Sequence, residues 1–438
     1  MILSRLLAVV MALCVLAAPA RATTFLRDAD MEYALGQLAA PILTAAGLSP
    51  SQIKIVVLDD PSLNAFVVDG RHIFLHSGLI LKLENAPALQ SVIAHEAAHI
   101  ANGHITRRLG NIRAARTAAG LGLLLAAAAG ASGADPSLAT GLAIGSQSSA
   151  QRRLFAHTRA EESAADISGV RYMARAGIDP QGAVDAISLF TGQLNLNESR
   201  LDPYAVTHPL SRDRLRALQA QVAGAPAHPR NPTHDYWFAR AQGKLSAFKR
   251  APAWTLRRIG SEPYKDVALM RQAVAYHRQS NLPKALKAID QAIAARPKDP
   301  YLRELKGQIL LESRQFAAAG QVYQAAANMA PREPLIHGGL GRARLAQGDF
   351  KGALQALEAA RGRDFSDPRL LRDLGVAYAR LGNNAMASLA TAERYALNGR
   401  MSDAELHATR AVGQLPRGSA PWQRAQDVLS AAKQAKRR

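Results

Sequence analysis

The spacing of apolar and polar residues changes twice in the first 110 residues. Leucine and isoleucine recur at helical spacing over residues 23–47, which predicts an amphipathic helix. Shorter apolar runs typical of strands then follow, at residues 53–58, 64–68 and 72–76. Asp69-Gly70, between the last two runs, favours a tight hairpin turn. We therefore expect a small antiparallel sheet after the first helix.

Helical spacing returns after these strands. Asn85 and Pro87 are typical of a helix start, because the first can cap the helix and the second fits its first turn. Helices are accordingly expected over residues 86–109, 151–177 and 183–190. Between them, residues 117–150 are almost uncharged and rich in Ala, Gly, Leu and Ser. This segment is expected to be a buried helical hairpin or, alternatively, a lid or a surface that touches lipid or substrate.

The C-terminal half of the chain repeats every 34 residues. Three positions of the repeat unit carry small residues or proline, at Ala273, Gly307, Gly341 and Gly375, at Ala285, Ala319, Ala353 and Ala387, and at Pro300, Pro334 and Pro368. Small residues let two antiparallel helices approach closely, and the prolines fit the turns between units. The period and the pattern resemble those of the tetratricopeptide repeat. The resemblance implies an all-α solenoid whose concave surface receives a polypeptide partner.

The first 22 residues have the pattern of a secretory signal peptide. Arg5 precedes an apolar run that is too short to span a bilayer, and Ala-Arg-Ala at residues 20–22 fits the rule for cleavage before Thr23. An uncleaved anchor is the alternative. Cleavage removes Cys14, the only cysteine, so the mature chain is expected to form no disulfide. We expect an exported protein without a transmembrane span in its mature part.

The chain is basic, with 54 Lys and Arg against 34 Asp and Glu, a net charge of +20. Such a charge raises nucleic acid or an anionic membrane surface as partners. The positive residues are scattered, and no cluster interleaves them with the scarce aromatic residues. No nucleic-acid partner is therefore expected, while peripheral contact with a membrane stays possible.

His95-Glu96-Ala97-Ala98-His99 lies in the middle of the long predicted helix. Residues one turn apart share a helix face, so the imidazoles of His95 and His99 can bind one metal ion. Glu96 is rotated from that face and can take a proton from a water that the metal activates. The alternative is a helix with two surface histidines. His104 lies off the shared face, and the Gly and His that the elongated metzincin motif needs three and six residues after the second histidine are Asn102 and Ile105 here, so a structural role is expected for His104.

A third ligand is expected from the helix over residues 151–177. Glu162 would complete a His2Glu zinc site whose fourth position holds water. Asp166, one turn later on the same face, could accept a hydrogen bond from the second nitrogen of a ligand histidine and fix its tautomer. Glu161 is the rival ligand, but it is rotated by about 100° from that face. A solvated acidic helix start is the alternative for this segment.

HExxH on one helix and E-x-x-A-D on a later one resemble the metallopeptidase superfamily that includes HtpX and the CAAX prenyl proteases. The resemblance extends to Asn64-Ala65-Phe66, Gly78-Leu79-Ile80 and Thr207-His208-Pro209-Leu210, with Arg214 six residues after the histidine. The HtpX and prenyl-protease branches carry transmembrane helices, so the tetratricopeptide repeats make this chain similar to periplasmic members instead. The resemblance implies one Zn²⁺ per chain, held by His95, His99 and Glu162, with Glu96 as base and Asp166 behind the ligands.

Two further features bear on catalysis. His208 would either stabilise the oxyanion or occupy the fourth metal position and keep the enzyme latent until substrate displaces it, a structural histidine before a helix being the alternative. Arg214 would hold that loop or contact the oxyanion. The strand at residues 64–68, with Asn64, Ala65 and Phe66, is the candidate edge for pairing with an extended substrate.

The expected organisation is an α+β zincin-type metallopeptidase domain, mostly helical with a small antiparallel sheet, followed by an all-α tetratricopeptide-repeat solenoid. The expected parts are a signal peptide (1–22), the metallopeptidase domain (23–224), a linker with a degenerate helical unit (225–262) and the repeats (263–438). The resemblance implies a zinc endopeptidase in the periplasm of a Gram-negative bacterium. Its expected partners are unfolded or misassembled envelope proteins, outer-membrane proteins above all, and the outer-membrane assembly machinery. A chaperone or scaffold with a silent metal site is the alternative.

Overall fold

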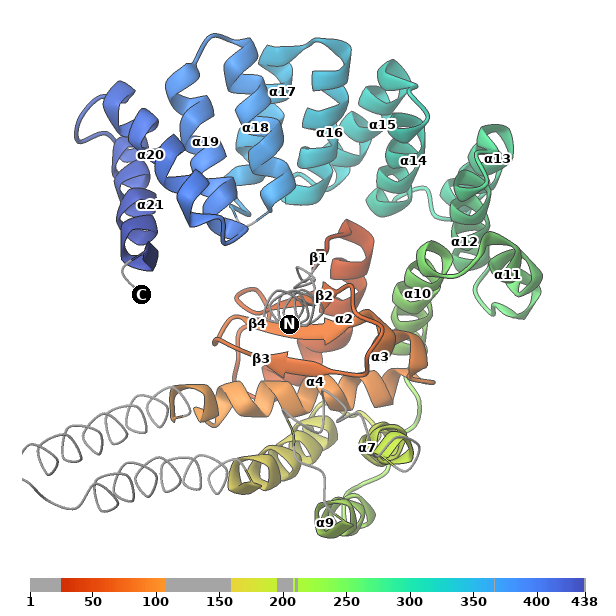
Figure 1. The fold of residues 1–438 in the computed structure, drawn as a ribbon. Helices are drawn as coiled ribbons and strands as arrows, with labels where there is room; N and C mark the ends of the chain where they lie inside the picture. The colour runs from red at the N-terminus through yellow and green to blue at the C-terminus, as the bar shows by residue number, and fades with distance from the viewer. Residues whose placement is uncertain (1–24, 108–158, 195–207, 209–211, 366, 437–438) are drawn as a thin grey trace, which may run out of the picture.

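The computed structural model describes residues 25–107, 159–194, 208, 212–365 and 367–436. The expected signal peptide and the uncharged segment 117–150 lie outside these residues. Figure 1 shows two parts, a mixed α/β part and a curved row of helices whose concave side faces the sheet and α2 (Ala29–Ala45). Among the described residues, no helix combines the length and the apolar character that crossing a bilayer requires.

Four strands form one sheet in the order β1-β2-β4-β3, with the bounds β1 (Phe25–Leu26), β2 (Lys54–Leu58), β3 (Ala65–Val67) and β4 (His72–His76). The hairpin expected around Asp69-Gly70 is present as the antiparallel pair β3–β4. The expectation of a purely antiparallel sheet is wrong, because β2 runs parallel to β4. After β2 the chain forms β3 first and then returns through the hairpin to form β4. β4 therefore lies between β2 and β3. This topology leaves β3 at an edge of the described sheet.

The buried face of the sheet packs on α2 and α4 (Ala86–Ala101). Alternate strand residues join these helices in one core, among them Ile55, Val57, Ile73 and Leu75. The first helix begins at Ala29, later than predicted, because residues 25–26 pair with β2 as β1. Asp28 caps this helix by accepting a hydrogen bond from the Met31 backbone at 2.9 Å. The N-terminal segment therefore adds a strand before it adds a helix.

The remaining helices of this part are α3 (Ser77–Lys82), α7 (Gln181–Leu194), α9 (Arg212–Ala223) and the helical residues 159–175. The helices predicted over residues 151–177 and 183–190 correspond to residues 159–175 and to α7. They lie on the side of α4 away from the sheet, as Figure 1 shows. α4 is thus enclosed by the sheet, α2 and these later helices, and its residues from Ala86 to His99, apart from Pro87, are buried.

The 34-residue period corresponds to a series of antiparallel helix pairs. Their bounds are α12 (Lys265–Arg278), α13 (Leu282–Ala295), α14 (Pro300–Glu312), α15 (Phe316–Met329), α16 (Pro334–Gln347), α17 (Phe350–Arg361), α18 (Pro368–Arg380), α19 (Asn384–Leu397), α20 (Met401–Gln414) and α21 (Ala420–Lys436). The small residues lie where helices approach. A Cβ on Gly341 would come within 2.5 Å of Leu357 Cγ, which no relaxed packing allows. The predicted solenoid is confirmed.

Two contacts fasten the solenoid to the α/β part. The first runs through α10 (Pro232–Lys249), which precedes the short helices α11 (Pro252–Arg257) and η1 (Ile259–Ser261). Arg240 on α10 donates to Asp30 of α2 at 2.6 Å and to Asp299 before α14 at 2.5 Å. The second contact joins Arg27, before α2, to Asp364 in the α17–α18 loop at 2.6 Å. The repeats from α14 to the α17–α18 loop are therefore anchored to the α/β part at both ends.

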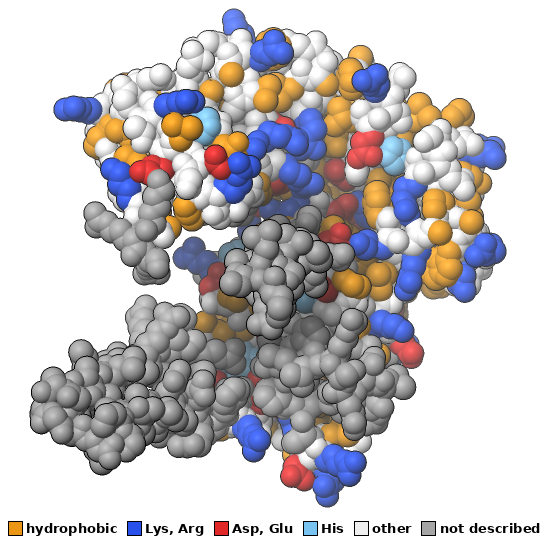
Figure 2. Space-filling view, viewed as in Figure 1, with side chains coloured by type: hydrophobic (Ala, Val, Ile, Leu, Met, Phe, Trp, Pro, Cys, Tyr) orange, Lys and Arg blue, Asp and Glu red, His pale blue; other side chains and the backbone are white. Residues whose placement is uncertain are grey.

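The molecule is hollowed between the two contacts, as Figure 2 shows below the arc of helices. Side chains of both charges line this hollow, including Glu304, Arg342, Asp367 and Arg369. On the visible face, lysine and arginine alternate with apolar and acidic side chains (Figure 2). The positive charge is thus spread over this face, as the sequence predicts.

Candidate metal centre

α4 positions the HExxH residues. Asn85 caps this helix by accepting from the Ala88 backbone at 2.8 Å, and Pro87 lies in its first turn, as predicted. The helical residues 159–175 pack directly on it, because Gly169 lies against the backbone of Ala94 and His95, where a Cβ would come into van der Waals contact at 3.4 Å. This packing brings Glu162 and the histidines of α4 together.

Four side chains converge on one point. His95, His99, Glu162 and His208 each offer a ligand atom, and these atoms lie within 4.8 Å of one another. All four side chains are buried, at 7%, 1%, 1% and 3% exposed. Among the described residues this is the group of histidines and carboxylates that could hold a metal ion.

The spacing of the His95, His99 and Glu162 atoms fits three ligands of a tetrahedral ion, while the four atoms together span up to 4.8 Å. His95 Nε2 lies 3.1 Å from His99 Nε2, 3.2 Å from the nearest Glu162 oxygen and 3.3 Å from His208 Nδ1. Glu162 lies 3.3 Å from His99 Nε2 and 3.0 Å from His208 Nδ1. Ligands about 2.0 to 2.1 Å from a tetrahedral zinc ion are separated by about 3.3 Å. Imidazole nitrogens and a carboxylate are also the donors that zinc prefers, so the residues present fit such an ion.

The charges at this point are strongly coupled. Burial disfavours ionised Glu162, but His208, His95 and His99 outweigh it and hold the pKa of that carboxyl far below its usual value. Burial also lowers the pKa of His95, yet hydrogen bonds to Asp166 and Glu162 raise it to about 10. Burial dominates at His99 and lowers its pKa to about 3, so that this imidazole stays neutral. An anionic carboxylate beside a neutral imidazole is a ready donor pair for a cation.

Asp166 and Arg214 lie directly behind the donors. Asp166 Oδ1 is 3.0 Å from His95 Nδ1, so it accepts the Nδ1–H and would hold the ligating tautomer once a metal takes the place of the Nε2 proton. Arg214 donates to both oxygens of Asp166, at 2.6 and 2.9 Å, and its Nη1 lies 2.9 Å from Glu162. Burial raises the pKa of Asp166, but Arg214 and His95 outweigh it and lower it overall. Arg214 thus contacts the carboxylates behind the donors.

Glu96 is fully buried beside the donor group and is not one of its members. Its Oε1 lies 3.4 Å from His208 Nε2. The same His208 nitrogen lies 3.2 Å from the carbonyl oxygen of Ala65 in the edge strand β3. His208 therefore contacts the donor group with one nitrogen, and Glu96 and the candidate substrate strand with the other.

The structure also separates the predicted site residues from their rivals. Glu161 stays outside the donor group, and its Oε1 lies 3.8 Å from Arg107 Nε. Asn64 is buried and its carbonyl accepts from the His76 backbone at 2.9 Å, while Phe66 is half-buried and stacks on Phe74. The strand Asn64-Ala65-Phe66 therefore borders the centre, with Ala65 nearest to it.

His104 is the residue that sequence reasoning misplaced. The prediction that it lies off the face of His99 assumes that the helix continues to residue 109. α4 ends at Ala101 instead, and Gly103 takes a left-handed conformation with φ of 70°. His104 then returns to His99, with their Nδ1 atoms 3.0 Å apart. The sequence signal was Asn102-Gly103, a pair typical of a helix C-terminus.

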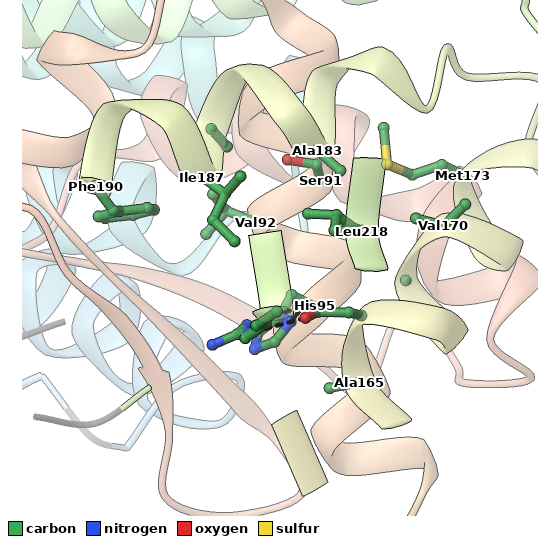
Figure 3. A pocket seen from close by; sticks show the side chains of 14 residues that line it. Ser91, Val92, His95, Ala165, Val170, Met173, Ala183, Ile187, Phe190 and Leu218 are labelled. Atoms are coloured by element: carbon green, nitrogen blue, oxygen red, sulfur yellow. Dashed lines mark hydrogen bonds and ion pairs between the residues drawn. The ribbon is translucent and has the colours of Figure 1, made fainter. Parts of the chain in front are cut away.

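A pocket adjoins the centre, as Figure 3 shows. Val92 on α4, Ile187 on α7 and Leu218 on α9 give it apolar walls, with His95 at one side. Asp166 and Arg214 also line it, so the pocket reaches the charged groups behind the donors.

Comparison with known proteins identifies the two parts. Residues 26–222 match Peptidase family M48, and residues 270–334 and 310–374 match the tetratricopeptide repeat. The chain combines an M48 peptidase domain with tetratricopeptide repeats. The M48 domain is that of a metallopeptidase, and the donor group described above lies within it.

Two of the curated relatives match most of the chain, and a third matches less than half of it. The β-barrel assembly-enhancing protease of Yersinia pestis is 25% identical over 83% of this chain and 74% of its own length. The protein of the same name from Escherichia coli K12 is 24% identical over 90% of this chain and 81% of its own length. The mitochondrial metalloendopeptidase OMA1 of Schizosaccharomyces pombe is 26% identical over 41% of this chain and 49% of its own length.

Proposed function

We propose that the M48 domain is a zinc-dependent endopeptidase with His95, His99 and Glu162 as the metal ligands. The observation that carries this proposal is the spacing of the His95, His99 and Glu162 donor atoms, which lie 3.1 to 3.3 Å apart as ligands of a tetrahedral zinc ion do. When bound, the ion would supply Lewis acidity to the attacking water and to the scissile carbonyl.

Glu96 is the general base in this proposal. Its carboxylate is buried, adjoins the donor group and lies 3.4 Å from His208 Nε2. From there it takes a proton from the attacking water and passes it to the leaving amine. Asp166 holds His95 in the ligating tautomer, and Arg214 keeps Asp166 ionised.

His208 holds the enzyme latent in this arrangement. Its Nδ1 completes the donor group and its Nε2 approaches the Ala65 carbonyl, which an extended substrate pairing with β3 would need. A substrate therefore has to displace His208 before it reaches the centre. On this basis His208→Ala raises the cleavage rate, and a fall in rate would instead assign it to the oxyanion.

The decisive experiment compares casein cleavage by the purified chain from Thr23 onward with cleavage by its Glu96→Gln variant at equal zinc content. We expect cleavage by the first and none by the second. Equal cleavage by both would remove Glu96 from the mechanism. Zinc stoichiometry tests the ligands separately, because Glu162→Gln should abolish stoichiometric zinc while the neighbouring Glu161→Gln, outside the donor group, should keep it.

A chaperone or scaffold role is the second candidate, and the four-donor group itself favours it. A zinc site with four protein ligands is typical of a structural ion. If neither the chain nor its His208→Ala variant cleaves casein while both bind zinc, the repeats carry the function and the ion is structural.

The names of the relatives support a proposal for the substrates and the location. We infer that the chain acts in the periplasm of a Gram-negative bacterium on misfolded or misassembled outer-membrane proteins, with the repeats contacting the assembly machinery. The relatives' shared name and their coverage of both parts of the chain support this inference.

A further inference from the structure

The end of α4 places an additional histidine behind the donor group. The Asn102 and Gly103 backbone nitrogens donate to Ala98 and Ile100, at 2.9 and 3.1 Å, and so close the helix. Arg107 N then donates to the Gly103 carbonyl at 3.1 Å and starts a new turn. Because Gly103 has positive φ, the chain changes direction after α4, and His104 lies against His99.

His104 and His99 contact each other directly, and both are buried from solvent. Their Nδ1 atoms lie 3.0 Å apart and their rings meet edge to face, with centroids 5.0 Å apart. Each residue is 1% exposed. Bulk water cannot replace either partner, so the proton between the two nitrogens has to be assigned to one of them.

Only one assignment permits metal binding. A neutral imidazole has one N–H and one lone pair, and a metal takes the lone pair. His99 Nε2 is the atom that faces His95 and Glu162, at 3.1 and 3.3 Å, so the His99 proton has to be on Nδ1. His99 Nδ1–H then donates, and His104 Nδ1 accepts. The opposite assignment places a proton on His99 Nε2 and blocks that donor.

We propose that His104 is a positioning residue that accepts the Nδ1–H of His99 and so keeps His99 Nε2 available as a metal donor. The inference rests on the proposed function. Each ligand histidine then has a hydrogen-bond acceptor at its Nδ1, which is Asp166 for His95 and His104 for His99. The two supports differ in charge, since one is a carboxylate and the other an imidazole.

The test measures zinc affinity of the purified chain by competition with a chromogenic chelator. His104→Leu and His104→Ala both remove the acceptor, one with nearly retained and one with reduced side-chain volume. Each should weaken zinc binding about 10- to 100-fold, the range found when a partner of a ligand histidine is lost. His104→Asn should recover most of the affinity, because its amide oxygen can accept where Nδ1 does.

Thermal unfolding of the metal-free variants separates this role from packing. Zinc binding at wild-type affinity by His104→Leu or His104→Ala would overturn the inference. So would equal weakening by His104→Asn and His104→Leu at equal metal-free stability, because the acceptor would then be irrelevant. Absence of zinc from the wild-type chain would overturn the proposed function itself, whereas loss of zinc in His99→Ala with no effect at His104 would overturn only the positioning role.

Discussion

Arg240 bridges the peptidase domain and the repeats, and its removal is expected to lower the free energy of unfolding. The side chain is 1% exposed and donates to Asp30 at 2.6 Å, to Asp299 at 2.5 Å and to the Tyr236 hydroxyl at 2.8 Å. Asp30 belongs to α2 of the peptidase domain, and Asp299 caps α14 of the repeats. One guanidinium therefore neutralises acids from both parts of the chain.

Arg240→Met keeps much of the apolar stem and deletes the charge. Asp30, itself 1% exposed, would retain Lys244 at 3.7 Å. Asp299 loses less, because it is more exposed and still accepts from the Tyr301 and Leu302 backbone at 2.9 and 3.3 Å. Removing one partner of a buried ion pair costs about 3 to 5 kcal/mol, so the free energy of unfolding should fall by that amount.

The assay is urea denaturation followed by circular dichroism, with Asp30→Asn completing a double-mutant cycle. The double variant should be more stable than the sum of the single changes predicts, by more than about 1 kcal/mol, because the charge that Arg240 neutralises is then gone. Arg303→Met on the partly buried face of α14 is the control and should cost under about 1 kcal/mol. A loss below about 1 kcal/mol for Arg240→Met, or strict additivity in the cycle, would refute the reasoning.

Two further predictions concern pH and packing in the repeats. Burial raises the pKa of Glu304 and of Glu333 to about 7, so their contribution to stability is present near pH 4.5 and is lost as the pH rises through 7. The unfolding midpoint should therefore fall between about pH 4.5 and pH 7 and level off above pH 7, and Glu304→Gln with Glu333→Gln should shrink that fall. The adjacent glycines of α16 should respond oppositely to alanine: a Cβ on Gly339 would lie 2.3 Å from the Tyr323 ring and cost about 1 to 3 kcal/mol, while nothing lies within 4 Å at Gly338, where alanine stabilises by up to about 1 kcal/mol. Equal effects at the two positions, measured by thermal unfolding, would contradict this packing.

Short or repeated sequence signals predicted several elements of the fold correctly. Asn85 and Pro87 fixed the start of α4, Asp69-Gly70 fixed the β3–β4 hairpin, and the 34-residue period predicted the helix pairs. Each of these signals acts within a few residues or repeats itself along the chain. Helical spacing also placed His95 and His99 on one face, and the structure brings Glu162 to them.

Two features of the sheet depend on long-range packing and could not be predicted from the sequence. The pairing of β2 beside β4 is decided by the core that both strands share with α2 and α4, and either direction satisfies the strand pattern. Residues 25–26 form β1 because β2 offers them an edge, although their spacing favours a helix. Both differences arise because tertiary pairing outweighs local preference where the local preference is weak.

His208 itself lies in neither a helix nor a strand. It reaches the donor group from the segment before α9, while Arg214 on α9 binds Asp166 and Glu162 behind that group. Arg214 therefore holds the start of α9 against the centre, and the segment carrying His208 begins six residues before that anchor. Both side chains contact Glu162, but Arg214 also binds Asp166, whereas His208 also approaches the Ala65 carbonyl of β3. On the proposed latent role, His208→Ala should therefore change the cleavage rate without loss of Glu162 as a ligand, because Arg214 still holds that carboxylate.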